Sequence, residues 1–157
     1  MKRFMTLLAV MAILVFVANT VWASGSTTVT PTGTVSNTCT STTSGTLAFA
    51  IDPSGTGSLT PATTDAGNSS PSIKCTKNSS HAVSCSSAHS NQLTIGNDGA
   101  TDPIAYTITT CGASGSLTGS GFSTTTSIPV GITITQAAYQ DAQAGAHADT
   151  ITVTITY

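Results

Sequence analysis

The last eight residues of the sequence alternate strictly between threonine and an apolar side chain. Residues 150–157 place Ile151, Val153, Ile155 and Tyr157 on one face and four threonines on the other. Because successive side chains of a strand point to opposite faces, this pattern predicts a β-strand with one buried face. The printed sequence ends with this strand, so we expect no later segment to pair beyond it.

The rest of the chain also favours strands over helices. Threonine suits strands because its branched Cβ packs well on a pleated surface, while Leu, Glu, Lys and Arg, which favour helices, are scarce. Turn residues such as Asp52-Pro53-Ser54-Gly55 separate the alternating runs, and we expect residues 136–148 to form a loop. Several short strands with frequent turns predict an all-β sandwich. The expected strands lie at residues 47–51, 73–76, 81–85, 93–95, 104–108 and 130–134, besides the last one.

The N-terminus has the three parts of a secretory signal peptide. Lys2 and Arg3 precede an apolar run over residues 7–18, and Val21-Trp22-Ala23 supplies small residues at a cleavage site. The run is shorter than the ~20 residues that a membrane-spanning helix needs. We therefore expect residues 1–23 to be cleaved and the protein to be exported.

The remaining chain has the length of one domain and very little charge. We divide it into an extended N-terminal segment over residues 24–38 and a β-sandwich domain over residues 39–157. Its only cations are Lys74 and Lys77. A chain so poor in cations cannot neutralise many phosphates, which argues against a nucleic-acid partner.

Cysteine usage indicates disulfides. Four cysteines follow the signal peptide: Cys39, Cys75, Cys85 and Cys111. An even number in a small exported domain predicts two disulfides, for which three connectivities are open. Cys75, His81, Cys85 and His89 are all zinc-ligand types within a short stretch, but no Cys-x-x-Cys knuckle accompanies them. We therefore expect oxidised cysteines, no metal site and no cofactor.

The sequence lacks the motifs of common enzyme classes. It has no Gly-x-Ser-x-Gly elbow for a hydrolase and no Gly-rich phosphate loop with its lysine. Its aspartates lie mostly in turns such as Asp52-Pro53 and Asp98-Gly99, where side-chain bonds to the backbone account for them. We expect that the protein is not an enzyme.

A series of short motifs along the chain carries a family resemblance. Cys39 is followed by Gly-Thr-Leu-Ala-Phe at residues 45–49, Ile-Lys-Cys-Thr at 73–76 and Ile-Ala-Tyr-Thr-Ile at 104–108. Ser-Ile-Pro-Val-Gly at residues 127–131 then precedes Ala-Gly-Ala-His-Ala-Asp-Thr at 144–150 and the alternating strand. In these motifs residues 39–157 resemble the spore coat protein U domain, the family that includes the archaic, Csu-type chaperone–usher pilins.

The resemblance implies an incomplete immunoglobulin-like β-sandwich that lacks its last strand. Ile151, Val153, Ile155 and Tyr157 would then border an open groove. In such pilins a periplasmic chaperone fills the groove first, and the N-terminal segment of the next subunit replaces it. The resemblance also implies the disulfides Cys39–Cys75 and Cys85–Cys111.

The N-terminal segment is the candidate donor strand, because Val29, Pro31, Gly33 and Val35 have the same parity. The predicted function is a structural subunit of a surface fibre (pilus) or coat, a homopolymer that serves adhesion and biofilm formation. Its expected partners are a periplasmic chaperone, an outer-membrane usher and further copies or related pilins, and it would pass through the periplasm to the cell surface. The alternative is a monomeric, self-complemented exported β-sandwich that binds carbohydrate or a surface.

Overall fold

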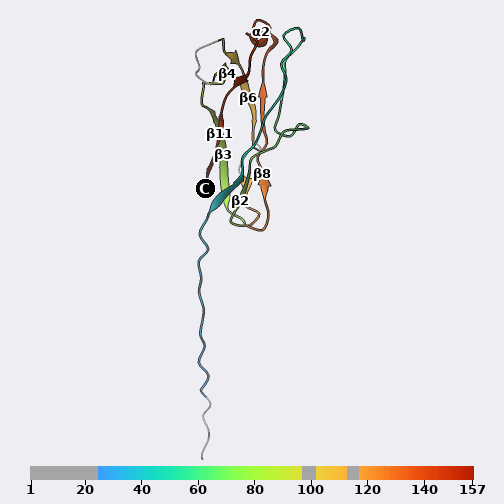
Figure 1. Cartoon of the computed structure of the whole chain (residues 1–157). Coiled ribbons are helices and arrows are strands. Elements are labelled where there is room, and N and C mark those ends of the chain that lie inside the picture. The colour runs from blue at the N-terminus through green and yellow to red at the C-terminus, as the bar shows by residue number, and fades with distance from the viewer. Residues whose placement is uncertain (1–24, 97–101, 113–116) are drawn as a thin grey trace, which may run out of the picture. The chain divides into compact units, whose positions relative to one another are not determined.

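The structure is a computed structural model that describes residues 25–96, 102–112 and 117–157. The expected signal peptide and the Asn97-Asp98-Gly99 turn lie outside these residues. The chain divides into two units, Met1–Thr34 and Val35–Tyr157. In the first unit, residues 25–34 are exposed throughout and form no strand or helix (Figure 1). The second unit is an all-β sandwich.

One long antiparallel ladder forms the first layer of the second unit. Strand β3 (Ser80–Ser87) pairs with β11 (Ile151–Thr156), and β4 (Gln92–Ile95) pairs with β10 (His147–Ala148). Since β4 follows β3 and β10 precedes β11, the two pairings continue one another. Figure 1 shows β3 and β11 side by side. The other edges of β3 and β4 carry two short strands, β7 (Leu117–Thr118) and β5 (Ile104–Ala105).

The second layer contains the remaining strands. Strand β2 (Ser72–Cys75) lies between β1 (Cys39–Thr43) and β8 (Thr126–Ser127), and β6 (Thr107–Cys111) pairs with β9 (Val130–Thr133). Tyr106 alone separates β5 from β6, so the chain changes its pairing partner from β4 to β9 at this residue.

Two disulfides reinforce the unit. Cys39–Cys75 joins the paired strands β1 and β2, and Cys85–Cys111 joins β3 to β6. These are the pairs that the resemblance implied. No cysteine is free.

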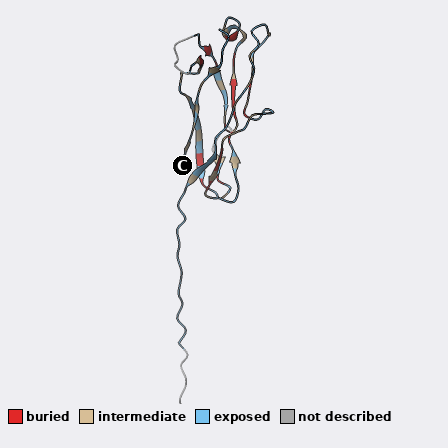
Figure 2. Cartoon of the chain, viewed as in Figure 1, coloured by how far each residue is buried: buried red, intermediate tan, exposed pale blue. Residues whose placement is uncertain are grey.

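The core consists of two apolar clusters between the layers. The larger one contains the buried Leu93, Ile104, Tyr106, Ile132, Ile134 and Tyr139. The smaller one contains Ile73, Cys75 and Ile128. Figure 2 shows β9 as a buried strand, and three of its four residues are buried. The short helix α2 (Gln136–Tyr139) buries Tyr139, whose hydroxyl donates a hydrogen bond to the Gly57 carbonyl at 2.7 Å.

The final strand was predicted correctly, since β11 spans Ile151–Thr156 with alternating half-buried and exposed residues. The prediction for residues 47–51 was wrong, because they form no strand. There the Ala48 N–H donates to the Asn68 side chain at 2.8 Å instead of to a neighbouring backbone, and only Thr46 forms a bridge, to Ser69. The expected loop at residues 136–148 contains α2 and β10. Within the described part of the chain, no helix is long and apolar enough to cross a bilayer.

Candidate functional site

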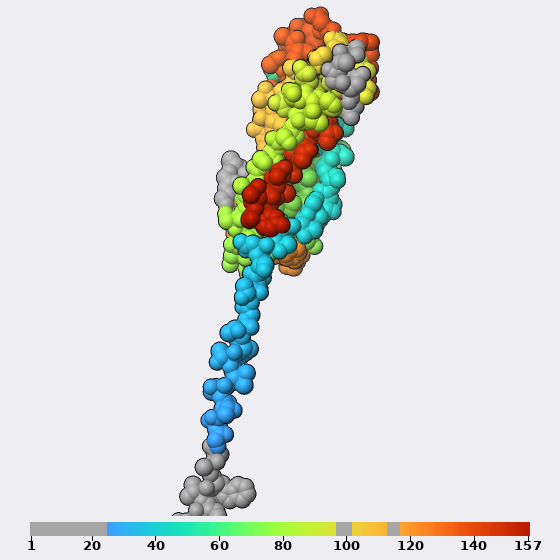
Figure 3. Space-filling model, turned by 90° about the vertical axis from the view of Figure 1, so that its left-hand side faces the viewer, coloured from blue at the N-terminus to red at the C-terminus, as the bar shows by residue number. Residues whose placement is uncertain are grey.

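A long apolar groove opens between the two layers. Its volume is about 1220 Å³. Strand β11 forms one wall, and residues 41–51 form the facing wall. Figure 3 shows these two walls, in red and cyan, running along the same face of the unit. Core residues form the floor of the groove, among them Ile73, Tyr106, Ile128 and Ile132.

The wall formed by β11 is an edge strand. In the order β11–β3–β7 it stands at one end, so among the described residues its second edge carries no ladder. Ile151, Val153 and Ile155 line the groove and are half-buried, while the alternating threonines are exposed. Tyr157, which the sequence places on the same face, is 56% exposed and does not line the groove.

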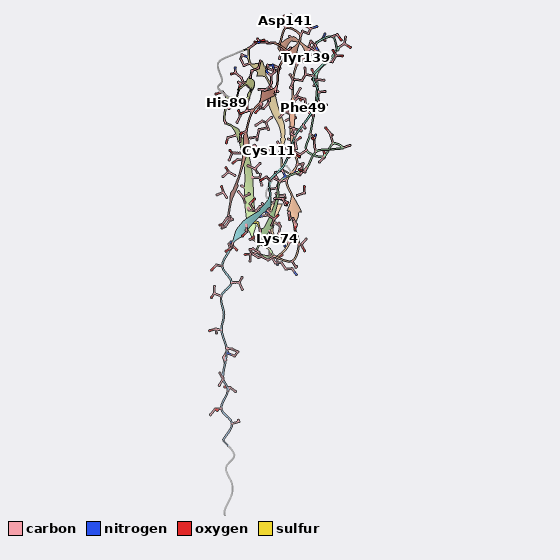
Figure 4. The ribbon with its side chains drawn as sticks, in the orientation of Figure 1. Phe49, Lys74, His89, Cys111, Tyr139 and Asp141 are labelled. Atoms are coloured by element: carbon pink, nitrogen blue, oxygen red, sulfur yellow. A yellow bond between two sulfur atoms is a disulfide. The ribbon has the colours of Figure 1, made fainter. Side chains whose placement is uncertain are left out.

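The facing wall is a second edge. Strand β1 stands at the end of the order β1–β2–β8. After it, Leu47, Phe49 and Ile51 line the groove and pack as half-buried side chains against the larger core cluster. Figure 4 shows Phe49 in the same half of the unit as Tyr139. The groove therefore lies between two unpaired backbone edges and above an apolar floor, which is the geometry that an added strand requires.

A buried carboxylate fixes one end of the groove. The Asp149 side chain, 1% exposed, precedes β11 and accepts hydrogen bonds from Ser87 Oγ (2.5 Å), Tyr106 Oη (2.5 Å) and His89 Nδ1 (2.8 Å). The backbone N–H groups of His89 and Thr150 also donate to it, at 3.2 and 2.6 Å. We call Asp149, Ser87, His89 and Tyr106 the carboxylate cluster. It connects the start of β11 to the end of β3 and to the junction of β5 and β6.

The carboxylate cluster shifts the acidity of two of its members. Burial raises the pKa of Asp149, but the hydrogen bonds from Ser87, Tyr106, His89 and the Thr150 backbone outweigh it, so the pKa lies below its ordinary value. Burial, together with the neighbouring Asp149 carboxylate, raises the pKa of Tyr106 to about 12. At neutral pH the cluster thus holds an ionised carboxylate that accepts a hydrogen bond from a neutral tyrosine hydroxyl.

The candidate donor residues are all exposed. Val29 is 86% exposed, Val35 is 81% exposed, and Pro31 and Gly33 are exposed as well. These exposed valines stand out, because the other β-branched apolar residues in the described part of the chain are buried or half-buried.

The structure does not bring together all four residues that the sequence grouped as zinc-ligand types. Cys85 forms a disulfide with Cys111, and the His89 side chain forms a hydrogen bond with the Asp149 carboxylate. Cys75 and His81 lie close together, but with Cys39 instead of Cys85. Figure 4 shows His89 away from Cys111, nearer the end of the unit.

Sequence reasoning missed the carboxylate cluster, although Asp149 belongs to the motif at residues 144–150 that contributes to the resemblance. Its partners Ser87, His89 and Tyr106 are distant in sequence. The β3–β11 ladder brings Ser87 and His89 to Asp149, and the β4–β5 pairing brings Tyr106.

Comparisons with known proteins add no assignment. No model of a known protein family matches the chain, and a search of curated proteins finds no match.

Proposed function

We propose that the protein is a structural subunit that assembles head to tail by strand exchange. In this proposal residues 29–35 of the N-terminal segment (residues 24–38) of one copy fill the groove of the next copy, while Ser36 and Thr38 stay paired with Thr76 of their own copy. Since each copy both donates a segment and accepts one, the contact does not close and builds a fibre or coat. The observation that carries the proposal is the apolar groove between two unpaired edges.

The proposed donor matches the groove in length. Six residues of β11 extend over about 20 Å, and the seven residues from Val29 to Val35 span about the same distance when extended. Alternate side chains of an inserted strand would point at the floor. The four residues of equal parity, Val29, Pro31, Gly33 and Val35, would then face it, and burial of each valine side chain would contribute ~1.5–3 kcal/mol.

The donor segment also matches the groove in chemistry. Residues 24–38 contain no charged side chain, so their burial carries no penalty for desolvating an ion. The threonines between the donor positions would face solvent, as they do along β11. Pro31 lacks an N–H and would leave one ladder bond unmade.

Contacts at the start of β1 favour exchange between copies over self-complementation. The Thr38 N–H donates to Thr76 Oγ1 at 3.0 Å, and the Thr76 N–H and hydroxyl donate to the carbonyls of Thr38 and Ser36. These bonds extend the β1–β2 pairing to residues that precede Cys39 in the chain. A segment that folded back into its own groove would have to break them, which is why we rank the self-complemented monomer second.

The proposal includes assistance during export. An open apolar groove with two free edges invites non-specific pairing, so a chaperone that supplies a temporary strand would protect it. Given the resemblance to the spore coat protein U domain, we infer a periplasmic chaperone, an outer-membrane usher and a final location on the cell surface.

The test is a heated electrophoresis series on the purified protein without reducing agent. We expect a ladder of SDS-resistant polymers that collapses to monomer only near boiling. The variants Val29→Asp and Val35→Asp should abolish the ladder, because they would bury a charge against the apolar floor. Their matched controls Thr30→Asp and Thr34→Asp, which change the other face, should keep it.

Two results would overturn the proposal. One is a monomer band at every temperature in the unaltered protein. The other is a chain lacking residues 24–35 that remains folded, soluble and without any partner, because its groove would then need no occupant.

A further inference from the structure

One buried histidine has no role in the proposed assembly. His81 lies in β3 opposite Leu117 and is 2% exposed. Neither of its ring nitrogens has a hydrogen-bond partner among the described residues. An unpaired buried polar group is costly, and an apolar side chain of similar size would fill the same space without that penalty.

One ring nitrogen of His81 lies near two sulfurs. The ligand atoms of Cys39, Cys75 and His81 all lie within 4.8 Å of one another. In the oxidised protein the two sulfurs are bonded to each other, so neither is a thiolate. With that bond opened, the same three backbone positions would hold two thiol sulfurs and one imidazole beside the smaller core cluster, to which Cys75 belongs.

We propose that Cys39, Cys75 and His81 form a binding site for a thiophilic divalent cation, of the Zn²⁺ class, in the thiol form of the chain. Two thiolates and a neutral imidazole are a common zinc donor set. Zn–S bonds of about 2.3 Å in a tetrahedral site put the sulfurs about 3.8 Å apart, which is compatible with the spacing of the three residues. Cys39 is only half-buried, so water reaches the fourth position from its side.

A thiol reductant can open the disulfide and so create the site. Two electrons and two protons from a dithiol open the Cys39–Cys75 bond to two thiols, and the dithiol becomes a cyclic disulfide. Binding of the cation then releases the two thiol protons, which makes the affinity rise with pH. In the reverse exchange a disulfide oxidant takes two electrons from the two thiolates and, with two protons from water, becomes a dithiol. The Cys39–Cys75 bond closes and the ion is expelled, because the sulfurs lose the charge that held it. The site thus couples release of a metal ion to disulfide formation.

Cobalt is the probe for the test. The mature chain is reduced with a phosphine, which becomes its oxide, and is titrated with Co²⁺ in the absence of oxygen. The sample carries Cys85→Ala and Cys111→Ala, so that Cys39 and Cys75 are its only thiols, and the unaltered chain is measured in parallel. We expect one Co²⁺ per chain with a thiolate-to-cobalt charge-transfer band, displaced by Zn²⁺ and absent in the oxidised protein.

The histidine provides the decisive comparison. His81→Ala should weaken Co²⁺ binding by about tenfold or more and change the d–d spectrum, while His147→Ala should leave both unchanged. Equal binding in His81→Ala and its parent would overturn the proposal and leave His81 as a tolerated core residue. A folded reduced chain that binds no Co²⁺ would overturn it as well.

The outcome is also decisive if the reduced chain unfolds. Because metal binding then supplies folding free energy, Zn²⁺ should restore the circular dichroism of the folded protein in the parent and not in His81→Ala. Failure of Zn²⁺ to restore the parent would refute the site.

Discussion

Replacing Asp149 by alanine should destabilise the protein strongly. The substitution removes the acceptor of five hydrogen bonds, three from side chains and two from backbone N–H groups. Tyr106 is 6% exposed, so its hydroxyl would stay unpaired in the core, which costs about 1–3 kcal/mol. Ser87 and His89 are half-buried and can recover part of their bonding from water. The expected total is a loss of about 3–5 kcal/mol of unfolding free energy.

Urea unfolding followed by circular dichroism measures this loss. The midpoint should fall sharply, with little change in the slope against urea concentration. Asp149→Asn keeps the shape and should lose less, whereas Asp141→Ala, which removes an exposed carboxylate, should unfold like the parent. An Asp149→Ala midpoint equal to that of Asp141→Ala would refute the idea that the carboxylate cluster stabilises the start of β11.

The same carboxylate makes stability depend on pH. The pKa of Asp149 is lower in the folded protein than its ordinary value of 3.8, so its contribution is complete above that value. The contribution is lost as the pH falls through the lower, folded-state pKa. We expect unfolding free energy to decline below about pH 4 in the parent, and to decline less in Asp149→Asn.

Three further predictions concern other parts of the unit. A Cβ on Gly119 would lie 2.0 Å from the Thr76 carbonyl oxygen, so Gly119→Ala should lower the melting temperature by several degrees in a thermal scan, and an unchanged scan would contradict this packing. The pKa of Tyr106 is raised from 10.0 to about 12 in the folded protein. The stabilisation that the neutral hydroxyl contributes is therefore complete below pH 10 and is lost between pH 10 and 12. In unfolding curves over that range, Tyr106→Phe should lose less unfolding free energy than the parent. The double variant Cys85→Ala/Cys111→Ala opens a loop with a sequence separation of 26 and should lower the unfolding free energy by about 3 kcal/mol, a loss that urea titration would measure and that a midpoint equal to the parent's would exclude.

Local patterns predicted the fold well where a strand has one wet and one dry face. The alternation of residues 150–157 identifies β11 because the threonines stay in water and Ile151, Val153 and Ile155 turn inward. The same alternation misled at residues 47–51. Those side chains face the core as expected. The groove lies beside their backbone, however, so no neighbouring strand is there to form a ladder. Side-chain alternation reports which face is buried and carries no information on whether a pairing partner exists.

The carboxylate cluster and the site around His81 could not be predicted from local patterns. Both depend on contacts between segments that are distant in sequence, such as Asp149 with Ser87 or Cys39 with His81. The sequence grouped Cys75 with Cys85 because they are close along the chain. In the folded unit, however, Cys75 on β2 is bonded to Cys39 on β1, and Cys85 on β3 is bonded to Cys111 on β6. Register and layer order, which the sequence does not reveal, decide these partners.

Hydrogen exchange along β11 in the assembled full-length protein tests strand exchange most directly. Alternate backbone amides of residues 151–156 pair with β3. The others lie on the free edge of β11, which faces the groove. We predict that both sets are protected in the assembled protein, because a donated strand pairs with the second set. In the double variant Val29→Asp/Val35→Asp, only the set paired with β3 should stay protected. Fast exchange of the outward amides in the assembled protein, at the rate seen in the double variant, would contradict the account.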